Sequence, residues 1–268
     1  MNASNTHVIA AWAVAPLLAD GNVRSEQVTQ LVLGETASVL ERKGEWLHVR
    51  TDADEYRGWV NEGYVLTVDA ARAGAWREAA TSWSMGAQVR VERGVLRVPL
   101  RARVMPKGAG VELPDGRWGA VFEGGIPALE AVRAEARLLR PDAWAWSCFA
   151  GTHYLWGGVT PLGVDCSGMV QTTFLARGVS LPRDAHQQAE AGVEVRPESG
   201  RPGDLLFFRS ERGERITHVA ILSEDDHIVH ATLACGGVMR EPWGPGSRAA
   251  TALRERLVHV RRVETPAI

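Results

Sequence analysis

The first 70 residues alternate short apolar runs with turn-forming residues. Within one such run, Leu47 and Val49 are apolar, while Trp46, His48 and Arg50 take the alternate positions. An alternation with a period of two residues predicts a strand that buries one face. Because turn signals recur at intervals of about 8 to 12 residues, the pattern favours a small antiparallel β-barrel over a helical domain.

Residues 84–124 repeat this character more loosely. Their runs "AQVRVERG", "VLRVPLRARV" and "DGRWGAVFEGG" also alternate, and "GRWGAV" is a weak echo of "YRGWVN" in the first stretch. We therefore expect one β-barrel over residues 1–70 and a second, followed by a linker, over residues 71–140. The linker has room for a turn or two of helix before Pro141.

The remaining residues, 141–268, combine helices with strands. Asp142 is in a position to cap a helix that Gly151 ends, and Asp165 to cap a second helix that Gly178 ends. Strand-like runs come afterwards, at 204–209, 217–222 and 227–232. Helices followed by hairpin-linked strands predict an α+β domain.

Composition and charge narrow the class of protein and of partner. With 268 residues, of which 45% are hydrophobic and 23% charged, the chain has an ordinary globular composition. The formal net charge is -2 and both signs are interspersed, so we expect no attraction to nucleic acid or to a membrane surface. The oligomeric state has no signature in the sequence.

The expected compartment is the cytoplasm. Three cysteines are too few, and too odd in number, for a disulfide framework, which favours reducing surroundings. The apolar run from Val8 to Leu18 follows no Lys or Arg, and Trp12 and Pro16 interrupt it, so we expect a strand rather than a signal peptide. Export by another route stays open as an alternative.

One of the three cysteines stands in a polar setting, in the stretch "GVDCSGMV". Cys166 follows the capping Asp165 and so lies in the first turn of a helix, where free backbone N–H groups and the helix dipole favour an anion. We expect it to be a nucleophile that alkylates well below pH 8. Cys148 and Cys235, in "WSCFAG" and "ATLACGG", are expected to be small packing residues.

Two histidines in the strand-like runs are candidates for the base that such a thiol needs. His218 and His230 lie in runs that a short turn joins, so an antiparallel hairpin brings them close, one facing the cysteine and the other orienting it. Zinc binding by Cys166 and the two histidines is the alternative chemistry. No Cys-x-x-Cys or His-Glu-x-x-His pattern supports it, and we expect neither a metal nor a cofactor.

A family resemblance becomes visible at this point. With "YLWGG", "GVDCSGMV", "LPRDAHQQ", "RPGDLLFF", "ITHVAIL" and "HIVHAT" in this order, residues 142–262 resemble the NlpC-type papain-like cysteine peptidases of bacterial cell-wall metabolism. The resemblance implies that Cys166 is the nucleophile, that His218 is the general base and then acid, and that His230 fixes the tautomer of His218. It also implies that Tyr154 lies near the thiolate.

The resemblance extends to substrate recognition and to the first barrel. It implies that Asp165, Ser167 and Asp184 line the substrate pocket; relatives often carry serine where this chain has Ala185. The Gly-Trp-Val at residues 58–60 is similar to the closing strand of bacterial SH3 domains, and residues 84–124 resemble those domains less well. Candidates for barrel residues that contact substrate are Glu35, Asp54, Glu55, Tyr56 and Tyr64.

The resemblance also implies a class of substrate, the murein peptides. The resemblance to the subgroup with SH3-like domains implies a γ-D-glutamyl-L-diamino-acid endopeptidase for peptides with a free N-terminal L-alanine, active in cell-wall peptide recycling. Two alternatives are an exported hydrolase of intact peptidoglycan and a wall-binding protein with a silent active site. For the two barrels, a role as structural packing modules is the alternative to a role in substrate recognition.

Overall fold

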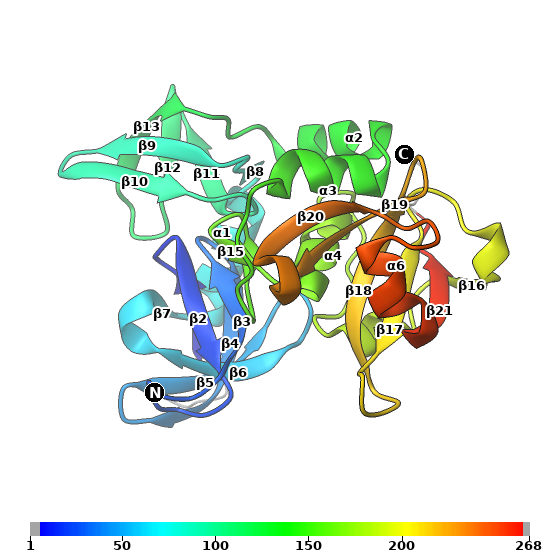
Figure 1. The fold of residues 1–268 in the computed structure, drawn as a ribbon. Helices are drawn as coiled ribbons and strands as arrows, with labels where there is room; N and C mark the ends of the chain where they lie inside the picture. Colours follow the sequence, from blue (N-terminus) through cyan, green and yellow to red (C-terminus); the bar gives the residue numbers. More distant parts are fainter. Residues whose placement is uncertain (1–5, 265–268) are drawn as a thin grey trace. The chain divides into compact units, whose positions relative to one another are not determined.

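The computed structural model describes residues 6–264 and divides the chain into two compact units (Figure 1). The division falls between Val132 and Arg133. Each unit is described by itself below.

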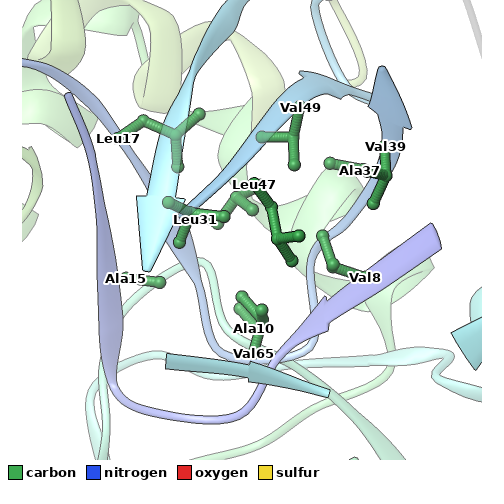
Figure 2. Packing of buried hydrophobic residues seen from close by; sticks show 11 residues of the cluster. Val8, Ala10, Ala15, Leu17, Leu31, Ala37, Val39, Leu47, Val49 and Val65 are labelled. Atoms are coloured by element: carbon green, nitrogen blue, oxygen red, sulfur yellow. The ribbon is translucent and has the colours of Figure 1, made fainter. Parts of the chain in front are cut away.

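The first unit begins with a seven-stranded antiparallel sheet in the order β3-β2-β6-β5-β4-β1-β7. Its strands are β1 (Thr6–Ala10), β2 (Val14–Leu18), β3 (Gln27–Val32), β4 (Thr36–Lys43), β5 (Trp46–Thr51), β6 (Arg57–Asn61) and β7 (Val65–Asp69). Leu47 and Val49 are buried in its core, as the alternation predicts, together with Val8, Leu31 and other apolar side chains (Figure 2). The pairings establish a sheet, and closure of this sheet into a barrel stays a prediction.

A helix that the sequence did not predict follows directly. Asp69 caps α1 (Ala70–Ala79) by accepting a hydrogen bond from the backbone N–H of Arg72 at 2.8 Å. Trp76 buries its ring in a second apolar cluster with Ile9 and donates its indole N–H to the carbonyl oxygen of Gly34 at 2.8 Å. The helix thus covers an apolar cluster beside the first sheet.

The second sheet of this unit has six strands in the order β10-β9-β13-β12-β11-β8. They are β8 (Ser82–Trp83), β9 (Ala87–Val91), β10 (Gly94–Val98), β11 (Arg103–Lys107), β12 (Gly110–Glu112) and β13 (Trp118–Glu123). In the first sheet, a short 3-10 helix, η2 (Glu62–Tyr64), connects β6 to β7. The predicted strands of residues 84–124 are therefore confirmed. α2 (Leu129–Leu138) is the helix expected in the linker.

In the second unit, the first helix starts earlier than predicted. α3 (Pro141–Phe149) has Arg140 at its N-cap and Pro141 in its first turn, so the prediction of Asp142 as the cap was wrong. Asp142 lies inside the helix, buried, and accepts a hydrogen bond from the Ser223 hydroxyl at 2.8 Å. α4 (Cys166–Leu175) begins as predicted, after Asp165.

The helices α3 and α4 precede a six-stranded antiparallel sheet in the order β16-β21-β17-β18-β19-β20, which bears out the α+β prediction (Figure 1). Its strands are β16 (Val193–Val195), β17 (Leu205–Arg209), β18 (Ile216–Ser223), β19 (His227–Thr232), β20 (Gly237–Pro242) and β21 (Leu257–Arg262). Shorter elements are β14 (Val159–Thr160), β15 (Gly163–Val164), α5 (Ala185–Gln188), η3 (Pro197–Ser199), η4 (Leu233–Cys235), α6 (Arg248–Leu253) and η5 (Arg254–Arg256). Within residues 6–264, none of the helices is long and apolar enough to cross a bilayer.

Candidate active site

Cys166 is the first residue of α4, and its position depends on the residues around it. Asp165 accepts a hydrogen bond from the backbone N–H of Gly168 at 2.7 Å and so caps the helix. Gly168 packs directly against the carbonyl oxygen of Gly158, and a Cβ at this position would collide with that oxygen. The "DCSG" stretch therefore starts a helix whose first turn is tightly packed, and Cys166 is only 5% exposed.

The backbone of β18 borders the Cys166 sulfur on both sides of His218. The sulfur lies 4.0 Å from the carbonyl oxygen of Thr217, and the backbone N–H groups of Val219 and Ser167 donate to the thiolate. The β18–β19 ladder begins at the pair Ile221 and Val229, further along the strand. The segment of β18 that carries His218 is thus the one that borders the first turn of α4.

His218 begins a chain of hydrogen-bonded side chains on the sheet. Its Nε2 atom lies 2.9 Å from Nδ1 of His230, and Nε2 of His230 lies 2.8 Å from Oε2 of Glu241. Glu241 is in turn bound by both ends of the Arg248 guanidinium, with Nε 2.9 Å from Oε1 and Nη2 in contact with Oε2. The predicted proximity of the two histidines is confirmed, as diagonal neighbours on adjacent strands.

Burial sets the charge state of the nucleophile and its base. Burial, followed by the nearby Asp165 carboxylate, raises the pKa of the Cys166 thiol to about 12, and the Val219 and Ser167 N–H groups only partly offset this. Burial, followed by His230 and Arg256, lowers the pKa of His218 to about 3. Both shifts favour a thiol and a neutral imidazole in the resting pair, which is opposite in direction to the expected resting thiolate.

This charge state is compatible with nucleophilic catalysis. Transfer of the proton from sulfur to the imidazole creates two opposite charges side by side and leaves the net charge of the site unchanged. Burial penalises either charge alone far more than it penalises the pair. Such a site can generate its thiolate at the moment of attack.

A buried ion pair fixes the start of α4. Arg183 donates from Nη2 to Oδ2 of Asp165 at 2.6 Å, and from Nη1 to Oδ1 at 3.1 Å. The same Nη1 also donates to the Ser167 hydroxyl at 2.8 Å, and Gly157 donates its backbone N–H to Asp165 at 2.8 Å. Asp165 and Ser167 thus hold the helix start in place, and their predicted contacts with substrate stay a prediction.

Tyr154 and Asp184 lie in the same unit as the nucleophile. Burial raises the pKa of the Tyr154 hydroxyl, and the neighbouring Cys166 and Asp165 raise it further, so the phenol lies within the electrostatic reach of the sulfur. Its backbone N–H donates to the carbonyl oxygen of Gly236 at 2.8 Å. Asp184 is half-buried at the N-cap of α5, directly before Ala185.

The predicted barrel residues belong to the other unit. The carboxylate of Glu35 accepts hydrogen bonds from Nε of Arg101 at 2.6 Å and from the backbone N–H of Val32 at 3.0 Å. Tyr56 is half-buried, and its backbone N–H donates to the Thr51 hydroxyl at 2.9 Å. Substrate contacts by Glu35 and Tyr56 stay predictions.

The three cysteines are all free. Cys148 is half-buried, whereas Cys235 is exposed, so the expectation that Cys235 is a packing residue was wrong. Among the residues that the structure describes, no three His, Cys, Asp or Glu side chains are grouped so that they could hold a metal ion.

Comparison with known proteins shows which family the chain belongs to. The family model of the NlpC/P60 family matches residues 151–260, and the model of a bacterial dipeptidyl-peptidase SH3 domain matches residues 17–63. A γ-D-glutamyl-L-lysine dipeptidyl-peptidase of Bacillus subtilis is 30% identical over 219 residues, which cover 76% of this chain and 71% of the relative. The chain belongs to the NlpC/P60 family. It is a cysteine peptidase of this family with an N-terminal bacterial SH3-like domain.

Two further comparisons agree with the NlpC/P60 assignment. A probable endopeptidase of Haemophilus influenzae is 47% identical over 92 residues, which are 34% of this chain and 56% of the relative; the match therefore spans just over half of that protein's length. The crystal structure of an NlpC/P60 family protein from Bacillus cereus superposes with a TM-score of 0.74 at 20% identity, over 97% of this chain and 100% of that one. The latter likeness shows that the fold is shared.

Three side chains of this NlpC/P60 site were missed by the sequence interpretation. Arg183, Glu241 and Arg248 each form an ion pair with a residue far along the chain or on another element. The only feature of the sequence that could have indicated Arg183 is the "LPRDAHQQ" motif, which includes it, together with the rule that a buried aspartate needs a cation. Glu241 and Arg248 lie in no motif that the sequence analysis singled out.

Proposed function

We propose that this protein is a cysteine endopeptidase that hydrolyses the γ-D-glutamyl-L-diamino-acid bond of murein peptides with a free N-terminal L-alanine. The observation that carries the proposal is that the Cys166 sulfur lies 4.0 Å from the carbonyl oxygen of Thr217, the residue directly before His218, and that His218 is hydrogen-bonded to His230. The B. subtilis relative is named a γ-D-glutamyl-L-lysine dipeptidyl-peptidase, and its similarity to this chain extends over 76% of the chain. A B. cereus relative of the same name is 37% identical over 87 residues, which are 32% of this chain and 26% of that relative.

The reaction starts with a proton transfer inside the buried pair. His218 takes the thiol proton as the Cys166 sulfur attacks the carbonyl carbon of the γ-glutamyl amide. The backbone N–H groups at the start of α4 and the Tyr154 hydroxyl are the donors available to the developing oxyanion. His218 then protonates the amine of the diamino acid, and the C–N bond breaks to leave a thioester on Cys166.

The second half of the reaction regenerates the enzyme. A water molecule loses a proton to His218 and attacks the thioester, which releases L-Ala-D-Glu and returns the proton to the sulfur. His230 keeps the His218 ring in place throughout, because the two rings share the 2.9 Å hydrogen bond.

Selection for a free N-terminus requires recognition of an ammonium group. A carboxylate that pairs with this ammonium would reject glycan-linked peptides, in which the alanine nitrogen is an uncharged amide. Asp184 is our candidate for this carboxylate in the peptidase unit. We assign the enzyme to recycling of released peptides in the cytoplasm, and its three free cysteines support a reducing compartment.

The proposal is tested by incubating the protein with L-Ala-γ-D-Glu peptides that carry lysine, ornithine or diaminopimelate, and with their N-acetylated forms. Mass spectrometry should detect L-Ala-D-Glu from the free peptides only, and only with wild-type protein rather than Cys166→Ala. Solubilisation of intact sacculi at a rate rivalling that of free peptide would contradict the proposed recycling role. Binding to sacculi without turnover of any of these substrates would contradict the peptidase assignment.

A further inference from the structure

We infer that Glu241, held by Arg248, is a positioning residue that fixes the protons of both histidines so that His218 presents a free lone pair to Cys166. The inference rests on the proposed peptidase function of Cys166 and His218. It extends the hydrogen-bonded chain by two residues from different elements, β20 and α6.

Glu241 is held where it can act on His230. β20 lies beside β19 in the sheet, with Ile228 opposite Glu241 and His230 opposite Met239, so Glu241 reaches His230 diagonally. The carboxylate accepts from His230 at 2.8 Å on one side and is bound by the Arg248 guanidinium on the other. Its side chain is 10% exposed and that of His230 is 2% exposed, so water competes little for this contact.

The carboxylate determines which nitrogen atoms carry protons. The bond to His230 and the two contacts with Arg248 lower the pKa of Glu241 to about 2, so the group is ionised at neutral pH and can only accept hydrogen bonds. Nε2 of His230 must therefore be a donor, which leaves Nδ1 of a neutral His230 as an acceptor. That acceptor receives a hydrogen bond from the Nε2–H group of His218, and Nδ1 of a neutral His218 is therefore the nitrogen without a proton.

This proton arrangement is the one that the proposed reaction needs. A neutral imidazole accepts the thiol proton only through its unprotonated nitrogen, so the opposite tautomer would leave His218 with no lone pair toward the sulfur. The carboxylate and the Arg248 guanidinium largely cancel each other's charge. Glu241 therefore acts by fixing the positions of protons more than by adding a net charge near the rings. Arg256 is the other charged group that acts on His218, and Asp165 acts on Cys166.

The variant Glu241→Gln separates proton position from shape. The amide has nearly the same size, but it can also donate a hydrogen bond, which permits the reversed chain in which His230 donates to His218. The matched control is Asp204→Asn, because Asp204 is also a buried carboxylate bound by both ends of an arginine. In this control pair, Nε of Arg262 lies 2.8 Å from Oδ1 and Nη2 lies 2.7 Å from Oδ2.

The experiment measures ring nitrogens and sulfur reactivity without substrate. In wild-type protein with ¹⁵N-labelled histidine, NMR should show both His218 and His230 with Nε2 protonated and Nδ1 unprotonated at neutral pH. In Glu241→Gln we expect the opposite tautomer or a mixture, and at least a tenfold slower alkylation of Cys166 by iodoacetamide. On the peptide substrate, kcat should fall by a similar factor while KM changes less than about twofold.

Several outcomes would overturn the inference. An unprotonated Nε2 on His230 in the wild-type spectrum would do so without any variant, which covers the case in which Glu241→Gln does not fold. Wild-type tautomers and alkylation in Glu241→Gln would do so as well, as would an equal loss of alkylation in Asp204→Asn. If wild-type protein does not release L-Ala-D-Glu, the proposed function fails, while the NMR and alkylation results still decide the inference.

Discussion

Arg183 forms a buried ion pair with Asp165, the residue directly before the nucleophile Cys166. Nη2 of Arg183 lies 2.6 Å from Oδ2 of Asp165, and the two side chains are 1% and 7% exposed. Removal of one partner leaves the other charge buried alone, which is far more costly than loss of an exposed pair. The ion pair that stabilises the peptidase unit therefore also holds the first turn of α4, which carries Cys166.

The first prediction concerns this ion pair. Arg183→Gln should lower the free energy of unfolding of the second unit by about 3 kcal/mol and abolish peptide hydrolysis. Urea denaturation followed by circular dichroism measures the stability change. Arg196→Gln is the control, because Arg196 and its partner Glu198 are exposed and their loss should cost less than about 1 kcal/mol. Equal losses in the two variants would contradict the assignment.

Gly168 provides the second prediction. Gly168→Ala should place a Cβ against the carbonyl oxygen of Gly158 and displace the start of α4, so that peptide hydrolysis is lost and the melting temperature falls. Gly74→Ala, within α1, is the control, since its Cβ would meet only a flexible arginine end at 3.9 Å. The control should gain about 0.5 to 1 kcal/mol from helix propensity alone. Full activity of Gly168→Ala would show that the contact with Gly158 is not needed.

Much of this architecture could be predicted from the sequence. Alternation at Leu47 and Val49 predicted strands correctly, and Asp165 followed by an apolar helical pattern predicted the start of α4. The cap of α3 was misplaced because Pro141, which favours the first turn of a helix, moves the N-cap two residues earlier, from Asp142 to Arg140, and places Asp142 inside the helix. The two correct predictions, the strands and the start of α4, each depend on residues that are neighbours in the sequence.

Other features depend on contacts between distant residues. α1 buries only Ala73 and Trp76 and so shows no clear apolar stripe. Glu241 meets His230 and Arg248 through strand register and a separate helix, and no spacing in the sequence encodes that meeting. Burial of Cys166 reverses the pKa shift that its helical position alone would produce, since burial outweighs the N–H groups. Local pattern could not show that burial.

The third prediction concerns the pH dependence of Cys166 alkylation. Because burial raises the pKa of this thiol to about 12 and lowers that of His218 to about 3, a stable ion pair is not expected near neutral pH. The iodoacetamide rate at Cys166 should therefore keep rising from pH 7 to pH 10, measured by mass spectrometry of the Cys166 peptide. A rate that is already constant from pH 5 upward would indicate a resting thiolate and contradict this account.

Acid stability gives the fourth prediction. The folded pKa of His218, about 3, lies below its ordinary value of 6.5, so the unfolded chain binds more protons between these values. Stability should therefore fall as the pH drops from 6.5 toward 3, and Glu241, whose pKa is lowered from 4.5 to about 2, should add to the loss below pH 4.5. Urea titrations across this range should show a shallower decline for His218→Ala. An unchanged slope would contradict the assignment.

The fifth prediction concerns Glu35 in the first unit. Its ion pair with Arg101 is nearly buried, with side chains 10% and 4% exposed, so Glu35→Gln should lower the free energy of unfolding by about 3 kcal/mol. Asp115→Asn, which disrupts the exposed pair with Arg117, should cost less than about 1 kcal/mol. Any effect of Glu35→Gln on substrate selection is measured separately, at a temperature where the variant is folded. The measurement compares its rates of hydrolysis of free and N-acetylated peptides. A stability loss no larger than that of Asp115→Asn would contradict the structural assignment.

The central claim is that the Cys166 sulfur forms a covalent bond with the γ-glutamyl carbonyl, and acid-quenched mass spectrometry of the working enzyme tests it most directly. Mixed with L-Ala-γ-D-Glu-L-lysine and quenched within one turnover, the protein should carry the mass of an L-Ala-D-Glu acyl group on the Cys166 peptide. Cys148→Ala and Cys235→Ala should retain that adduct. Turnover without an adduct on Cys166, or undiminished turnover by Cys166→Ala, would contradict the account.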